Sequence, residues 1–292
     1  MILFAIALIG GIIIGGLFAF VSLGLYLIIL FPVIMGLAGG LLLFQGIRWG
    51  KIRNPLVAIL SGVFMAVVIY GAFHYGGYID FQTEAKDYFV TEMGEKPADV
   101  LNAMVNGFLI RETGQSEFFG YMAWQAKEGV TISRVVSSKD SGINLGPTFS
   151  WIYWLVELVI IAWAAASRAR DAARQPFCEQ CDQWYGKERL LGQVENELSP
   201  IMIAAVDSGD FYKAGSMLRS PAPAPCAAVF VQTCSRCASS DPLITLKQIS
   251  VNRKNQPQTS EIRKFLAGRR QLADLERGLQ TDVVASPPAA VE

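Results

Sequence analysis

The sequence predicts an α-helical membrane protein with four transmembrane helices, a small, mostly helical extracytoplasmic cap, and a C-terminal cytoplasmic α+β domain with a four-cysteine zinc site. Three observations predict this class. Only 17% of the 292 residues are charged, whereas about 25% are charged in soluble domains. Residues 1–75 contain no acidic residue, which is a composition suited to lipid. All five cysteines lie beyond residue 177.

Four segments are apolar and long enough to cross a bilayer, which takes about 20 helical residues. They are about Met1–Phe20, Leu23–Phe44, Pro55–Tyr75 and Thr148–Ala166. No cation precedes the first segment, and its apolar run continues into the second, so we expect a retained transmembrane hairpin and not a signal peptide. The predicted units are residues 1–75 with three helices, the cap at 76–147, the fourth helix at 148–166, the zinc-binding domain at 167–279 and a disordered tail at 280–292.

The positive charges predict the orientation. The loop at 45–54 has three cations and no acid, and three arginines follow the fourth segment within residues 168–174. With four spans these clusters lie on one side, so we expect both termini in the cytoplasm, the cap outside, and the chain in the cell inner (plasma) membrane. The cysteines agree, because the cap has none and paired thiols bind metal in a reducing compartment.

Glycines recur at a spacing of four in the first two segments, at Gly11 and Gly15 and at Gly36 and Gly40. Small residues at this spacing let helices approach closely. We expect them to pack within the hairpin or against a second copy, and the alternative is a glycine-lined pore in an oligomer. Neither segment contains an acidic or basic residue, which favours packing. Pro32 predicts a kink in the second segment.

Glu157 is a carboxylate near the centre of the fourth segment. Such a residue costs at least about 2.5 kcal/mol to insert, which makes it a candidate functional residue; the alternative is a satisfied packing group. We expect it to face the bundle, with Ser61 and Tyr70 as candidate hydrogen-bond donors. His74, at the outer end of the third segment, is expected to be interfacial. Straight helices would separate it from Glu157 by roughly 12 Å in depth, so we do not pair them.

The cap sequence is too long for a simple connector. Its capping residues, proline and glycines predict three helices, at 83–94, 97–114 and 116–129, and alternation at 130–135 predicts a strand. No catalytic group of residues is evident in it, and its acids are expected to form a solvated face.

Two CxxC pairs, Cys178 with Cys181 and Cys234 with Cys237, stand in the C-terminal part. A two-residue spacer lets both sulfurs of a turn reach one ion, and two turns complete a tetrahedral four-thiolate zinc site. The 52 residues between the pairs exceed the roughly 15–20 of a compact site, so the two turns must meet across an insertion. Cys226 is either a buried small residue or a substitute ligand.

These two turns and their strand-like flanks, 227–233 and 242–251, resemble the zinc-ribbon or zinc-knuckle class. The resemblance implies a structural zinc ion held by Cys178, Cys181, Cys234 and Cys237, in a site closed to substrate. The long insertion, with helical signals at 195–219, departs from the usual pattern of this class. Two alternatives remain for the thiols, a redox dithiol and inert free cysteines.

An amphipathic helix is predicted at 260–278, with Ser260 as its cap. From about residue 280 the chain is rich in proline and alanine, and we expect disorder.

The function that follows from these features is non-catalytic. There is no GxGxxG, P-loop or HExxH motif, and one histidine excludes most general-base schemes. The 25 basic and 25 acidic residues balance, so no nucleic acid partner is expected. We predict a multi-pass membrane scaffold, assembly or interaction component that presents its zinc domain to a protein partner or forms a homo-oligomer. The alternatives are a small channel or transporter using Glu157, and a membrane thiol oxidoreductase.

Overall fold

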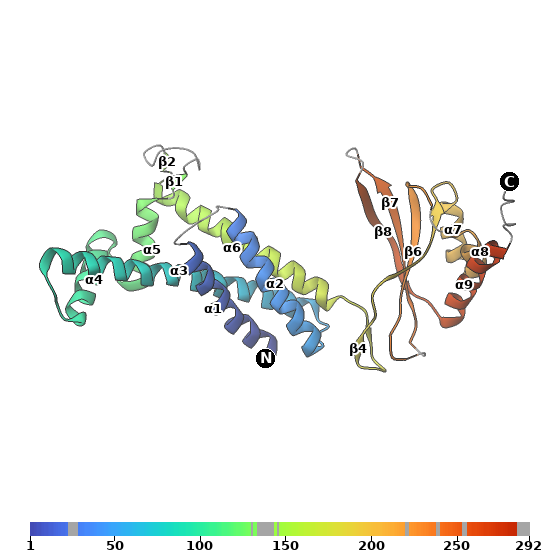
Figure 1. The fold of residues 1–292 in the computed structure, drawn as a ribbon, viewed down its shortest axis with the longest axis horizontal. Coiled ribbons are helices and arrows are strands. Elements are labelled where there is room, and N and C mark those ends of the chain that lie inside the picture. Colours follow the sequence, from blue (N-terminus) through green and yellow to red (C-terminus); the bar gives the residue numbers. More distant parts are fainter. Residues whose placement is uncertain are drawn as a thin grey trace, which may run out of the picture. The chain divides into compact units, whose positions relative to one another are not determined.

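The computed structural model describes residues 1–22, 29–129, 131–132, 143–144, 146–219, 222–237, 240–252 and 256–284. The chain divides into two compact units, Met1–Arg174 and Gln175–Glu292, which we call the N-terminal and C-terminal units. Both are drawn as ribbons in Figure 1. Each is described by itself below.

Within the described residues, four helices of the N-terminal unit are long and apolar enough to cross a membrane. They are α1 (Ile2–Ser22), α2 (Leu30–Gly50), α3 (Pro55–Met93) and α6 (Gly146–Ala173). This confirms the predicted set of four long apolar helices. Pro32 lies in the first turn of α2, where its missing N–H group has no partner to lose. It therefore does not interrupt the helix, in contrast to the kink predicted at this residue.

Helix α3 is much longer than its apolar segment. Asn54 caps its start, because the Asn54 side chain accepts hydrogen bonds from the N–H groups of Leu56 and Val57. The helix then continues without a break to Gly94. The separate helix predicted at 83–94 is therefore wrong: the Thr83 hydroxyl donates to the carbonyl of Ile79 and caps nothing.

The glycines in α1 and α2 do produce close packing, but with other partners than predicted. A Cβ atom at Gly15 would meet the carbonyl oxygen of Ile69 in α3, and one at Gly36 would lie 2.7 Å from the Cβ of Ala164 in α6. Gly11 likewise faces α3 and Gly40 faces α6. These four glycines thus join α1 to α3 and α2 to α6, instead of closing the hairpin on itself.

The cap region contains α4 (Ala98–Thr113), α5 (Glu117–Glu128) and a short antiparallel pair, β1 (Thr131–Ile132) with β2 (Ile143–Asn144). The two helices confirm the predictions at 97–114 and 116–129. Of the strand predicted at 130–135, only β1 falls within the described residues. Tyr78 of α3, Leu109 of α4 and Tyr121 of α5 form a small buried cluster.

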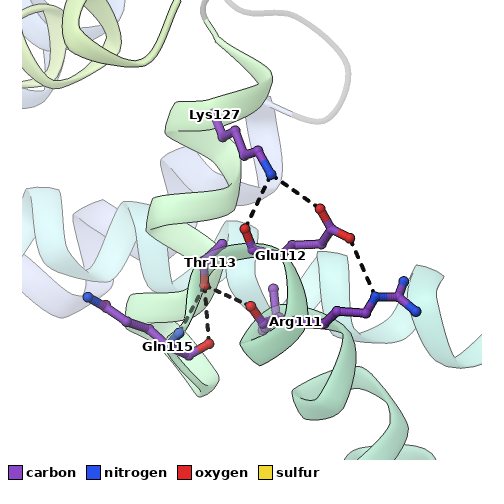
Figure 2. A network of polar contacts seen from close by, with 6 residues as sticks. Arg111, Glu112, Thr113, Gln115 and Lys127 are labelled. Atoms are coloured by element: carbon purple, nitrogen blue, oxygen red, sulfur yellow. Dashed lines mark hydrogen bonds and ion pairs between the residues drawn. The ribbon is translucent and has the colours of Figure 1, made fainter.

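A polar network fastens the end of α4 to the end of α5 (Figure 2). The Lys127 ammonium group donates to the backbone oxygen and the carboxylate of Glu112, both at 3.3 Å. The Thr113 hydroxyl donates to Leu109 at 2.7 Å and accepts from the Gln115 N–H at 3.1 Å. Exposed ion pairs contribute at most about 1 kcal/mol, so this network sets the position of α5 more than it stabilises the fold.

The C-terminal unit is built on an antiparallel sheet with strand order β5-β6-β7-β8. Its strands are β5 (Arg189–Glu195), β6 (Cys226–Gln232), β7 (Leu243–Val251) and β8 (Pro257–Leu266). Helices α7 (Ser199–Asp207), α8 (Phe211–Ser216) and α9 (Arg269–Val284) lie on one side of the sheet. Side chains from both layers, including Met202, Val229, Ile244 and Leu275, form one buried core.

Two predictions for this unit need correction. The helical stretch at 195–219 is two helices, because Gly209 has φ +81° and Asp210 caps α8 by accepting from the Lys213 N–H. The helix predicted at 260–278 is wrong in its first part: residues 260–266 pair with β7, and α9 starts only after Gly268. Helix α9 also includes residues 280–284, which were assigned to the disordered tail; the rest of that tail lies outside the described residues.

Candidate functional site

The structure brings together the four predicted zinc ligands, Cys178, Cys181, Cys234 and Cys237. Their sulfur atoms all lie within 4.8 Å of one another, and the Cys178 and Cys237 sulfurs are 3.5 Å apart. A tetrahedral zinc site with Zn–S bonds of about 2.3 Å has sulfurs about 3.8 Å apart. None of the four is joined to another by a disulfide bond. The donor set and its spacing therefore fit a tetrahedral metal ion.

Each CxxC pair sits on a tight turn. In the first, β3 (Phe177–Cys178) pairs with β4 (Gln183–Trp184) to form a small hairpin. Asp182, which follows the second cysteine, takes the left-handed conformation with φ +50°, which aspartate tolerates better than most residues. The second turn follows directly after β6. Each turn therefore holds the two sulfur atoms of its CxxC pair on the same side of the turn.

The sheet explains how the turns meet across 52 residues. Arg189 at the start of β5 lies opposite Val231 near the end of β6. The chain before β5 and the chain after β6 therefore leave the sheet at the same end. A hydrogen bond of 2.9 Å from the Gly186 N–H to the Thr233 carbonyl joins them there. The insertion is thus a sheet-and-helix excursion that returns to its starting point.

Hydrogen-bond donors are directed at the sulfurs. The Gln183 side-chain amide donates to the Cys234 sulfur at 3.2 Å. Burial opposes the charged form of Cys234, but the hydrogen bonds from the backbone N–H groups of Arg236 and Cys237 and from Gln183 together lower its pKa. Among Cys178, Cys181 and Cys234, these donors make Cys234 the one best prepared to be a thiolate, which is the form that binds metal.

The pKa values of two other cysteines in the cluster, Cys178 and Cys181, are raised. Burial raises the pKa of Cys178. The hydrogen bond with Cys237, followed by burial, raises the pKa of Cys181 to about 12. Burial and the hydrogen bonds among the thiols both favour the protonated form. A bound bivalent cation would offset the cost of burying the negative charge and deprotonate its ligands.

Cys226 does not belong to the cluster. It is the first residue of β6 and lies opposite Glu195 and Ile249, whereas Cys234 follows the last residue of that strand. Six strand residues rise roughly 20 Å. Cys226 is 1% exposed, so the structure selects the buried small residue from the two roles left open.

Glu157 forms a second group of buried polar side chains, in the N-terminal unit. It is 2% exposed. Its two carboxylate oxygens accept hydrogen bonds from the hydroxyls of Tyr70 at 2.9 Å and Tyr153 at 2.5 Å. Tyr70 was predicted, and Tyr153 was missed although its position four residues earlier on the same helix indicates contact. The Ser61 prediction is wrong, because its hydroxyl donates to the Val57 carbonyl at 2.8 Å.

His74 is buried and lies among aromatic rings, and its place at the membrane interface stays a prediction. Its ring centroid lies 4.5 Å from that of Tyr70 and 5.2 Å from that of Trp154, both in edge-on contacts. His74 and Glu157 line the same cavity. We had not expected His74 and Glu157 to share a cavity, because two straight helices would place them at different depths.

Comparisons with protein-family models, with curated proteins and with solved structures find no match for this chain.

Proposed function

We propose that this chain is a multi-pass integral membrane protein that presents a zinc-stabilised domain to a protein partner and has no catalytic role of its own. In this proposal, α1, α2, α3 and α6 cross the cell inner membrane, the region of α4 and α5 lies outside, and both termini are cytoplasmic. Zinc bound by the four cysteines holds the CxxC turns at one end of the sheet. The bound ion is structural, because four protein ligands leave no open position for a substrate.

The single observation that carries this proposal is the four-sulfur cluster. Its four thiols come from two turns that the sheet returns to one place, and donors surround Cys234. A dithiol exchanger typically places one CxxC motif at the start of a helix, whereas here the first pair begins at the last residue of β3 and the second pair follows β6. This arrangement favours a structural metal over the redox alternative.

Capture of the partner tests the scaffold function. The full-length chain, tagged and extracted from its native membranes in mild detergent, is expected to retain a reproducible protein partner. The Cys181→Ser variant is expected to lose that partner, because it removes one of the four zinc ligands and so destabilises the C-terminal unit that the partner would contact. Cys226→Ala, which changes a cysteine outside the cluster, serves as the matched control and should retain it. An empty capture with the parent chain would contradict the proposal.

A second candidate, a small channel or transporter, is favoured by one separate observation. The Glu157 carboxylate lines a cavity although it lies in an apolar helix, and ionisable residues in such positions commonly mark ion or substrate paths. Flux across proteoliposomes that disappears in Glu157→Gln would support this candidate. Equal leak through the parent and the variant would remove it.

A further inference from the structure

We propose that the cavity between α3, α5 and α6 in the N-terminal unit binds an organic cation, with Glu157 as its counter-ion. This inference concerns a binding site that the scaffold function does not use, and it does not require transport. The cavity has a volume of about 450 Å³, which is within the range of small-molecule sites. Its position is set by the long extension of α3 beyond the apolar segment.

The charge of the cavity wall selects the sign of the ligand. Three carboxylates line it, Glu157 from α6 and Asp80 and Glu84 from α3, and no lysine or arginine is among its described lining residues. The Tyr70 and Tyr153 hydroxyls donate one hydrogen bond to each oxygen of Glu157. This arrangement suits the ionised form, since an ionised carboxylate only accepts. An acidic wall of this kind attracts a cation and repels an anion.

Two buried polar atoms in the wall point to a ligand that forms hydrogen bonds. Nε2 of His74 and Oε1 of Gln125 have no hydrogen-bond partner among the described residues, and both residues line the cavity. His74 is only 7% exposed. Native proteins rarely leave such atoms unsatisfied. A ligand carrying N–H or O–H groups would satisfy Gln125 Oε1 and, in the tautomer protonated at Nδ1, His74 Nε2.

The aromatic residues favour an organic cation over a metal ion. Phe81, Trp124 and Trp154 line the cavity together with Tyr121, and ring faces attract ammonium groups. A bare metal ion would need several ligand atoms close together. Within the described residues, the four cysteines are the one group of histidine, cysteine and carboxylate side chains that could hold a metal.

The pKa of Tyr121 is affected by burial and by two carboxylates of the cavity wall, Asp80 and Glu84. Burial, followed by the negative charges of Asp80 and Glu84, raises its pKa to about 12. Its hydroxyl stays protonated at neutral pH, and Tyr121 is one of the residues that line the cavity. The outer part of the cavity is thus acidic and polar, and its inner part ends at Glu157.

Binding of a defined cation by the full-length protein tests this site. The protein is purified in detergent and titrated calorimetrically at constant sodium chloride with benzylammonium, ethanolammonium and choline, each of which carries an N–H or O–H donor. Their neutral isosteres, in which carbon replaces the charged nitrogen, are ethylbenzene, propan-1-ol and 3,3-dimethylbutan-1-ol. We expect saturable binding of at least one cation, and binding weaker by about tenfold or more for its isostere.

Variants locate the site. Glu157→Gln keeps the size of the side chain and removes its charge, so it should weaken cation binding by about tenfold or more. Asp80→Asn provides a second reduction of charge if the first variant does not fold. Glu95→Gln removes an exposed carboxylate that does not line the cavity and should leave binding unchanged.

Three results would overturn the site: no binding of any of the three cations, equal binding of cation and isostere, or an equal loss in the Glu95→Gln control. The flux assay is separate. A protein that binds the cation but does not move it across a vesicle wall keeps this site and loses the transporter candidate.

Discussion

The sulfur atoms of Cys178 and Cys237 lie 3.5 Å apart, too far for a disulfide, whose S–S length is about 2.05 Å, and close enough to share a ligand. Glu157 presents a different case, because the chain itself supplies hydroxyl donors to both of its oxygens. Thiols are weak donors and weak acceptors, so contacts among the four cysteines are weaker than these hydroxyl–carboxylate hydrogen bonds. At the scale of residues, we therefore expect the cysteine cluster to depend on a bound ion, whereas the chain supplies the hydrogen bonds of Glu157.

Metal content follows directly from this dependence. We expect the purified chain to carry about one zinc ion and Cys234→Ser to carry none, because the substitution removes the best-prepared thiolate. Structural zinc stabilises small domains by on the order of 10 kcal/mol, so the C-terminal unit of the variant should also unfold at lower temperature. Elemental analysis and thiol titration measure the first effect, and calorimetry measures the second.

Cys226→Ala is the control for this experiment, since it also removes a buried cysteine but leaves the cluster intact. It should keep its zinc. A parent chain free of zinc, with all its thiols reactive, would exclude the metal site. Zinc loss in both variants would indicate that the cluster geometry is not as described.

At the scale of helices, the packing of α1 on α3 depends on a single face of α1. A side chain at Gly15 would press on the backbone of α3, whereas a Cβ at the neighbouring Gly16 meets nothing within 4 Å. The two glycines are adjacent in sequence, yet a helix turns them to different sides. The close approach is thus a property of a face and not of the glycine content.

Substitution at these two positions separates packing from composition. Gly15→Ala should destabilise the N-terminal unit by about 1–3 kcal/mol, because overpacking against backbone forces the helices apart. Gly16→Ala should be nearly neutral. Thermal unfolding of the two variants in the same detergent checks this. Equal stabilities would contradict the described α1–α3 contact.

Local signals in the sequence predicted the elements that local physics controls. The apolar lengths gave the four long helices, and Gly114 and Gly129 marked the ends of α4 and α5. The CxxC spacing identified all four clustered cysteines. These features depend on residues within a few positions of one another, which is why they could be predicted without the fold.

Features that depend on distant contacts were missed. Residues 260–266 have apolar positions that fit a helix, but pairing with β7 overrides that tendency, as tertiary context often does. Strand β5 was not predicted, although it is the element that brings the two CxxC turns together. The enclosure of His74 depends on α6, which is distant in sequence. The helix predicted at Pro55–Tyr75 is too short, because α3 continues to Met93 beyond the end of its apolar segment.

For the whole molecule, the proposed orientation in the membrane bears directly on the proposed zinc site. The acid-free loop at 45–54 and the arginines at 168–174 favour the cytoplasm, where thiols remain reduced and can bind metal. The opposite orientation would expose the cysteines to an oxidising compartment. Evidence against the proposed orientation would therefore also be evidence against the proposed zinc site.

Labelling from one side of the membrane tests this link. Glu95→Cys, between α3 and α4, should react with a membrane-impermeant maleimide in intact cells or sealed right-side-out vesicles. Arg53→Cys, between α2 and α3, should gain labelling above that of the parent chain, which has five cysteines of its own, only after permeabilisation. Both positions are exposed, so a difference in reactivity reports the side of the membrane and not burial. The reverse pattern would place the sulfur cluster outside, and it would then be expected to form disulfides, which contradicts both the orientation and the structural role proposed for zinc.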